Sequence, residues 1–71
     1  MLNILLVDDD ADFTDVAANI IELLGHAVSV ATNLAEAYEL LENQRFDHIL
    51  LDFMLPDGSG LHMVDHLKKS S

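Results

Sequence analysis

The sequence predicts an α/β domain built on a parallel β-sheet of three strands in the order 2-1-3. Short apolar runs rich in Ile, Leu and Val alternate with longer segments whose apolar residues recur every three or four positions. This alternation is typical of buried parallel strands separated by amphipathic helices. Right-handed crossover connections then place the first strand at the centre of the sheet.

Length and composition limit the possible functions. The 71 residues suffice for one small domain, 1–71, and a hydrophobic content of 51% indicates a folded chain. The net charge of −10 disfavours direct binding to nucleic acids and to anionic membranes. Without cysteine, disulfides and thiolate metal sites are excluded. No apolar run approaches the ~18 residues that span a membrane and no leader pattern is present, so we expect a cytoplasmic protein.

The first half of the chain predicts two strands and the helix between them. The first strand is expected at about 3–7, and the second, a weaker candidate, at about 27–31. Between them a helix is expected at about 11–24, and Gly25 suits its C-terminal end. The apolar face of this helix is formed by Phe13, Val16, Ala17, Ile20, Leu23 and Leu24.

The second half predicts a further helix and strand, then a turn and a third helix. The second helix is expected at about 33–43, with Asn33 as its N-cap and the side chain of Glu36 reaching back. The third strand is expected at about 48–52. We then expect a turn, because this stretch holds one proline and two glycines, with Asp57 as an ordinary turn residue.

The third helix is expected at about 59–69. Ser59 can cap its N-terminus, and Leu61, Val64 and Leu67 would face inward. Lys68 and Lys69 would lie at its C-terminal end, where positive charge is favoured. The element order is therefore βαβαβα.

Aspartates follow two of the predicted strands. Asp8, Asp9 and Asp10 follow the first strand, and Asp52 closes the third. An open parallel sheet gathers the carboxyl ends of neighbouring strands at one edge, so we expect Asp8 and Asp9 to lie within reach of Asp52. Oxygen ligands without His or Cys favour Mg²⁺, with Mn²⁺ as an alternative. A carboxylate beside such a cation is also able to accept a phosphoryl group.

Three sequence motifs in this order resemble the receiver domain of bacterial two-component response regulators. They are Ile4-Leu5-Leu6-Val7-Asp8-Asp9-Asp10, then Ile49-Leu50-Leu51-Asp52, then Leu55-Pro56 with Gly60 four residues after the proline. The resemblance implies a flavodoxin-like, doubly wound parallel sheet. It covers essentially all 71 residues, which correspond to the N-terminal βαβαβα portion of that fold. The family's Thr or Ser after strand four and its lysine after strand five lie outside the matched portion.

The resemblance also implies roles for individual residues. Asp52 would be the phosphoacceptor, and Asp8, Asp9, Asp52 and the backbone carbonyl of Met54 would be the ligands of Mg²⁺. Asp10 would help to cap the first helix. The implied phosphoryl donor is a phosphohistidine on a sensor histidine kinase or phosphotransfer protein, so the chain would serve phosphorelay signalling and would not be a turnover enzyme.

A fold of three strands leaves the edge of the third strand and one side of the first helix open. We therefore expect self-association, most simply as a two-fold dimer through that edge or that helix. Two other functions remain open from the residues: a structural self-association module with a vestigial acidic site, and a Mg²⁺-dependent phosphohydrolase with an aspartate nucleophile. His62 and His66 lie four apart on one helix, but without a third ligand we interpret them as surface residues.

Overall fold

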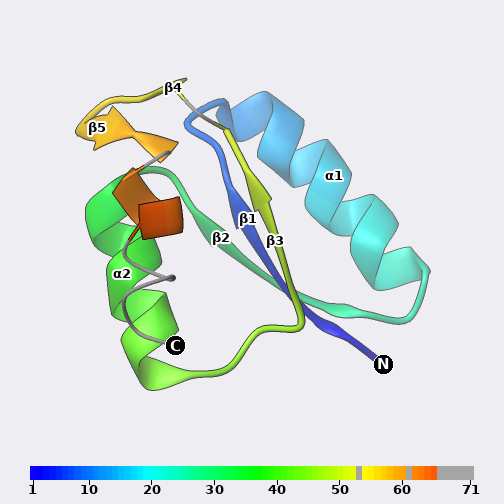
Figure 1. The fold of residues 1–71 in the computed structure, drawn as a ribbon. Coiled ribbons are helices and arrows are strands. Elements are labelled where there is room, and N and C mark those ends of the chain that lie inside the picture. The colour runs from blue at the N-terminus through cyan, green and yellow to red at the C-terminus, as the bar shows by residue number, and fades with distance from the viewer. Residues whose placement is uncertain (53, 61, 66–71) are drawn as a thin grey trace.

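The computed structural model describes residues 1–52, 54–60 and 62–65. Its centre is a parallel sheet of three strands, β1 (Asn3–Val7), β2 (Ala27–Ala31) and β3 (His48–Leu51). The strand order is β2-β1-β3, so the predicted order 2-1-3 is confirmed (Figure 1). The buried residues Ile4 to Val7 of β1 explain why this strand is central, since each of its faces must be covered.

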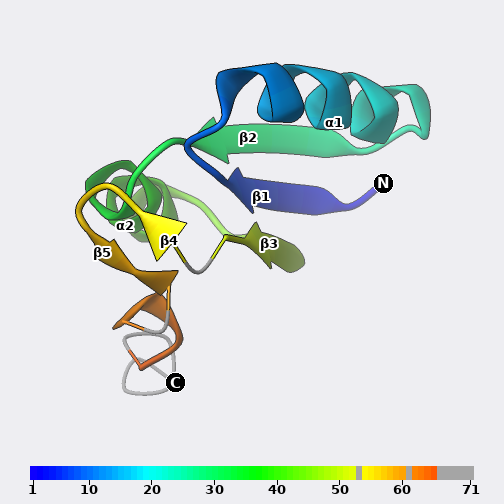
Figure 2. The same ribbon diagram turned by 90° about the horizontal axis from the view of Figure 1, so that it is seen from above.

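The two long helices lie on opposite faces of this sheet. The helices are α1 (Ala11–Leu23) and α2 (Leu34–Asn43) (Figures 1 and 2). The chain steps from β1 to β2 in one direction and returns across β1 to β3 in the other. Right-handed connections then put α1 and α2 on different sides. No helix in the described part of the chain is long and apolar enough to cross a membrane.

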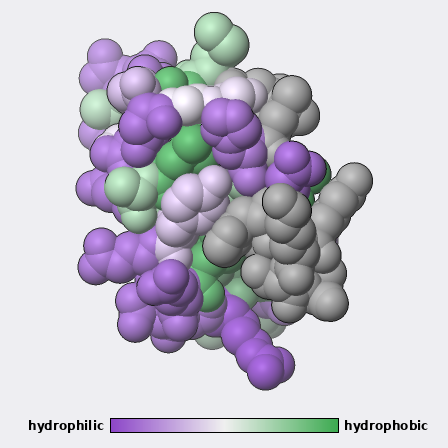
Figure 3. Space-filling model, turned by 60° about the vertical axis from the view of Figure 1, so that its left-hand side comes forward, coloured by the Kyte–Doolittle hydropathy of each residue, from purple (hydrophilic) through white to green (hydrophobic). Residues whose placement is uncertain are grey.

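The main hydrophobic core lies between the sheet and α2. It consists of side chains that are almost fully shielded from water: Leu5, Val7, Ala31, Leu34, Ala37 and Met63. Because side chains alternate along a strand, Leu5 and Val7 face this core while Ile4 and Leu6 face α1. The outer surface of this side is covered mainly by hydrophilic side chains (Figure 3).

Helix α1 packs differently from the sequence expectation. Most of the predicted apolar face is exposed, with exposed fractions of 51% for Phe13, 53% for Ile20 and 86% for Leu23. Within the predicted face only Ala17 is half-buried, whereas Thr14, outside that face, is buried, and Ala18 and Ile21 are half-buried. The small side chains on this second face let the helix approach β2, and the described residues place no further layer over the larger ones.

The segment after Asp52 forms a small antiparallel hairpin instead of a simple turn. Strand β4 (Met54–Leu55) pairs with β5 (Gly58–Ser59) across Pro56 and Asp57. Gly58 directly follows this two-residue connection as the first residue of β5, and its φ of +150° is a conformation that glycine adopts without a Cβ penalty. Ser59 thus belongs to β5. Residues 60 and 62–65 are helical, and positions 61 and 66–69 of the helix expected at about 59–69 lie outside the described residues.

The hairpin is attached to the first turn of α2. The carboxylate of Asp57 accepts hydrogen bonds from the backbone N–H of Leu34 (2.7 Å) and of Ala35 (3.1 Å). The bond from Leu34 is the largest cause that holds the pKa of Asp57 below its ordinary value, and desolvation opposes it. The N-cap Asn33 accepts from the N–H of Glu36 (2.8 Å). Every backbone donor of this first turn therefore has an acceptor.

Glu36 completes the start of α2 on the other side. Its carboxylate accepts from the hydroxyl of Thr32 (2.6 Å) and from the backbone N–H of Thr32 (2.8 Å). The hydroxyl bond first, and the backbone bond second, lower the pKa of Glu36. The side chain reaches back as the sequence suggested, to the residue that precedes the N-cap.

Replacing Gly58 should destabilise the fold more than replacing Gly25. Both residues have a positive φ, but a Cβ at Gly58 would lie 2.8 Å from Cδ1 of Leu34, whereas a Cβ at Gly25 meets nothing within 4 Å. We expect Gly25→Ala to lower the free energy of unfolding by about 1 kcal/mol, and Gly58→Ala by about 1–3 kcal/mol more, because of the overlap. Urea unfolding followed by circular dichroism measures both, and equal losses would contradict the close approach.

Acid should weaken the attachment of the hairpin to α2. The pKa of Asp57 in the folded chain lies below its ordinary value of 3.8, so the stability it contributes is present above that value and is lost as the pH falls through the lower folded pKa. The bonds from Thr32 hold the pKa of Glu36 below its ordinary value, although the negative charge of Asp57 acts to raise it. The stability that Glu36 contributes is therefore also lost as the pH falls. We expect Asp57→Asn to flatten the fall of unfolding free energy below about pH 4. Urea unfolding at a series of pH values tests this, and unchanged slopes would refute it.

Candidate cation site

The ends of β1 and β3 place the predicted aspartates next to each other. Val7 and Leu51 are register partners at the ends of the two strands, and Asp8 and Asp52 come next on each. The N–H of Asp52 donates to the carbonyl of Val7 (2.9 Å), so the pairing continues one residue beyond the sheet. On the other side the N–H of Asp8 donates to the carbonyl of Ala31 (3.0 Å).

Three carboxylates meet at this edge. One oxygen from each of Asp8, Asp9 and Asp52 lies within 4.8 Å of the others. Asp8 and Asp52 are half-buried and Asp9 is exposed, so the group opens to solvent on one side. The convergence expected from the sequence is thus present in the structure. Such a spacing suits three ligands of one cation.

Local hydrogen bonds orient these side chains. Asp8 accepts from the N–H of Asp10 through Oδ1 (3.0 Å), and Asp52 accepts from the N–H of Met54 through Oδ1 (3.1 Å). Asp10 turns to α1 instead, where its Oδ1 accepts from the N–H of Phe13 (3.1 Å) as the N-cap. Asp8 and Asp52 therefore each use one oxygen to fix the backbone beside them, and a second oxygen remains on each.

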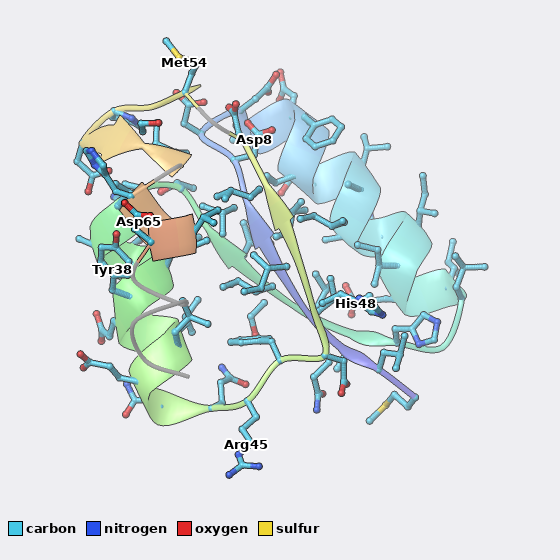
Figure 4. All side chains as sticks on the ribbon, viewed as in Figure 1. Asp8, Tyr38, Arg45, His48, Met54 and Asp65 are labelled. Atoms are coloured by element: carbon cyan, nitrogen blue, oxygen red, sulfur yellow. The ribbon has the colours of Figure 1, made fainter. Side chains whose placement is uncertain are left out.

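Met54 lies at the same end of the molecule as Asp8, while Arg45 and His48 lie toward the opposite end (Figure 4). Met54 is 80% exposed, and its backbone N–H is bonded to Asp52. His62 is exposed, in accord with a surface role, and His66 lies outside the described residues.

The donor set fits a hard divalent cation. All three converging groups offer carboxylate oxygens, which Mg²⁺ and Mn²⁺ prefer. Three negative charges this close repel one another, and a bound cation would relieve that repulsion. Backbone pairing at the strand ends holds Asp8 and Asp52 in place.

A groove leads away from this site between α1 and β3. Its volume is about 470 Å³, and Asp8 and Asp52 lie at its edge. The other lining residues are apolar: Leu6, Val7, Phe13, Ala17, Leu50 and Leu51. We refer to this feature as the α1–β3 groove. The sequence had indicated an open strand edge here, but not a groove.

Asp57 makes a tertiary contact that the sequence did not predict. An Asp-Gly pair is a common turn signal, and nothing in the local sequence points to a distant helix. The two backbone donors of α2 that it engages lie more than 20 positions earlier in the chain. Only the tertiary fold reveals that contact.

Comparison with known proteins shows the family of the chain. A family model described as the response regulator receiver domain matches residues 4–71. The chain belongs to this family of signalling proteins. The resemblance to receiver domains and the predicted α/β fold class are both confirmed.

Individual relatives are consistent with the family. The chain is 37% identical over 71 residues, all of this chain, to a transcriptional regulatory protein CpxR homolog from Haemophilus influenzae, of which it covers 31%. The non-phosphorylated HemR receiver domain from Leptospira biflexa superposes with a TM-score of 0.92 at 32% identity, covering 97% of this chain and 56% of that one.

A second solved structure is the response regulator TrrA from Thermotoga maritima in complex with Mg²⁺-BeF. Its TM-score is 0.91 at 27% identity, covering 100% of this chain and 62% of that one. The chain thus spans about a third of the curated relative and somewhat more than half of these two solved chains.

Proposed function

We propose that this chain acts in phosphorelay signalling as a phosphoryl-accepting module. Asp52 accepts the phosphoryl group from a phosphohistidine on a sensor histidine kinase or phosphotransfer protein. Asp8, Asp9, Asp52 and the backbone carbonyl of Met54 hold Mg²⁺, for which Mn²⁺ is able to substitute. The observation that supports this most is the convergence of three carboxylates at adjacent strand ends, in a member of the receiver family.

The chemistry follows from the position of Asp52. One carboxylate oxygen of Asp52 forms a bond to phosphorus, the bond from phosphorus to the imidazole nitrogen breaks, and its electron pair returns to that nitrogen. Mg²⁺, when bound, neutralises charge on the phosphoryl oxygens. The N–H of Met54 holds Oδ1 of Asp52, which fixes the carboxylate plane for attack. The pairing of Asp52 with Val7 keeps the backbone still during transfer.

We infer that the chain catalyses only its own phosphorylation and is not a turnover enzyme. A phosphohydrolase of the aspartate-nucleophile kind carries a second aspartate two residues after the nucleophile, where this chain has Met54. The net charge of −10 supports a protein partner over direct contact with nucleic acid or membrane. Such a phosphoryl donor implies action in the cytoplasm.

Mg²⁺ and beryllium trifluoride together should form a complex with this chain that neither forms alone. TrrA was solved with this pair, and MaeR, a response regulator, was solved with beryllium trifluoride. We expect protein-bound beryllium trifluoride to give new ¹⁹F signals only when Mg²⁺ is present. Calorimetric titration with Mg²⁺ alone should show one site per chain.

Two site variants and one control variant complete this experiment. Asp52→Asn should abolish the ¹⁹F signals, and Asp9→Asn should weaken Mg²⁺ binding about tenfold or more, because each removes a charged ligand. Asp15→Asn removes the same charge from an exposed position of α1 and should leave both measurements close to those of the wild type. Mg²⁺ binding that survives both site substitutions would overturn the proposed function.

We also propose that two copies of the chain associate through α1 and the open edge of β3. Strand β3 pairs only with β1 in the described sheet. Exposed apolar side chains lie along α1, at its C-cap and on β3: Phe13, Val16, Ile20, Leu23, Leu24 and Leu50. An apolar surface of this kind, next to a strand edge, favours pairing with a second chain.

Salt should strengthen this self-association, because each copy carries a net charge of −10 and screening weakens the repulsion. Sedimentation equilibrium should show Ile20→Thr raising the dimer dissociation constant about tenfold, or about 1.4 kcal/mol. Val30→Thr makes a comparable change on β2, outside the apolar surface, and should have little effect. A monomer at high concentration and high salt would contradict the dimer.

A further inference from the structure

The β4–β5 hairpin connects the carboxylate site to the start of α2. At its first residue, the N–H of Met54 donates to Oδ1 of Asp52 (3.1 Å). At its turn, the carboxylate of Asp57 accepts from the N–H groups of Leu34 and Ala35 (2.7 and 3.1 Å). Two contacts at opposite ends therefore determine where this short segment lies.

The first turn of α2 is a specific receptor for the Asp57 carboxylate. Asn33 already accepts from the N–H of Glu36, so Leu34 and Ala35 supply the two remaining donors. Both oxygens of Asp57 are engaged, one by each donor, and the positive end of the helix dipole adds to the attraction. A neutral turn residue would lose this charge-assisted pair.

The receptor is itself fixed to the carboxylate site. The N–H of Asp8 donates to the carbonyl of Ala31, three residues before Leu34, and the N–H of Asp52 donates to the carbonyl of Val7. Together with the two hairpin contacts, these bonds close a ring that runs through the ends of β1 and β2, the first turn of α2, the hairpin and Asp52. Asp57 supplies the link of this ring between the hairpin and α2, so its loss removes the hydrogen bonds that attach the hairpin to that helix.

The hairpin also fits closely against α2. A Cβ at Gly58 would lie 2.8 Å from Cδ1 of Leu34 and 3.2 Å from Nδ1 of His62. A residue larger than glycine at this position would therefore push the hairpin away from these side chains. Leu34 is part of the main core and is 5% exposed. The contact of Asp57 with its backbone is thus backed by a rigid neighbour.

We propose that Asp57 is a positioning residue of the cation site: by anchoring the hairpin to the first turn of α2, it holds the backbone of Met54 in place beside Asp52. This inference rests on the proposed function, in which the Met54 carbonyl is a ligand of Mg²⁺. Asp57 does not touch the cation. It acts through the hairpin, and its loss leaves the three converging carboxylates in the chain.

The test is a Mg²⁺ titration of the wild type, Asp57→Ala and Asp57→Asn, followed by NMR. In the wild type, Mg²⁺ should shift the carboxylate ¹³C signals of Asp8, Asp9 and Asp52 and the carbonyl ¹³C signal of Met54. In both variants we expect affinity to fall about tenfold. The Met54 shift should shrink while the carboxylate shifts persist, and the amide protons of Leu34 and Ala35 should exchange faster with solvent.

Controls separate positioning from charge. Glu42→Gln removes one negative charge at an exposed position near the C-terminal end of α2 and should leave the Met54 shift unchanged. Raising the salt concentration to ~0.5 M suppresses long-range charge effects, so the loss of affinity in the Asp57 variants should persist there. Asp57→Asn keeps the size of the side chain and serves as the variant if Asp57→Ala unfolds.

The outcomes distinguish the two proposals. If Mg²⁺ shifts none of the carboxylate signals of the folded wild type, the proposed function fails. If the wild type binds Mg²⁺ while the Asp57 variants show the same affinity and the same Met54 shift, the positioning role of Asp57 is overturned. An effect of Asp57→Asn that vanishes at high salt and is matched by Glu42→Gln also overturns it.

Discussion

The parallel pairing of β1 with β3 is the interaction on which the site depends. Val7 and Leu51 are partners in this register, and the next residue on each strand is an aspartate. A slip of one residue would turn every side chain of β3 to the other face and separate Asp52 from Asp8. The pairing is in turn held by burial of β1 from Ile4 to Val7, so a hydrophobic strand at the centre of the sheet determines the geometry of a polar site at its edge.

The strand order and the convergence of the carboxylates were predictable from the sequence because both follow from strong, local patterns. Continuous runs of Ile, Leu and Val indicate buried parallel strands, and right-handed connections are compatible with the first strand at the centre. Asp8 and Asp52 are placed by the strands they follow. The same holds for Asn33, since an N-cap depends on donors only a few residues away.

Features that depend on distant partners were not predictable in this way. The apolar spacing in α1 indicated a helix, but it could not show that Thr14 and Ala18 would face the sheet while Phe13 and Ile20 stay exposed. That choice depends on how closely the helix approaches β2. Asp57 is the second example, because its local sequence is that of a turn and its partners are in another helix.

The unequal packing of the two faces of the sheet has a dynamic consequence. On one side Leu5 and Val7 contact a shielded cluster that includes Leu34 and Met63, whereas on the other Ile4 and Leu6 are covered by a helix with few large inward side chains. Transient detachment of α1 would expose Ile4 and Leu6 and leave that cluster intact. Such partial openings cost less free energy than global unfolding. The molecule is therefore softer on the side of α1, and the carboxylate edge lies where the soft and the rigid layers meet.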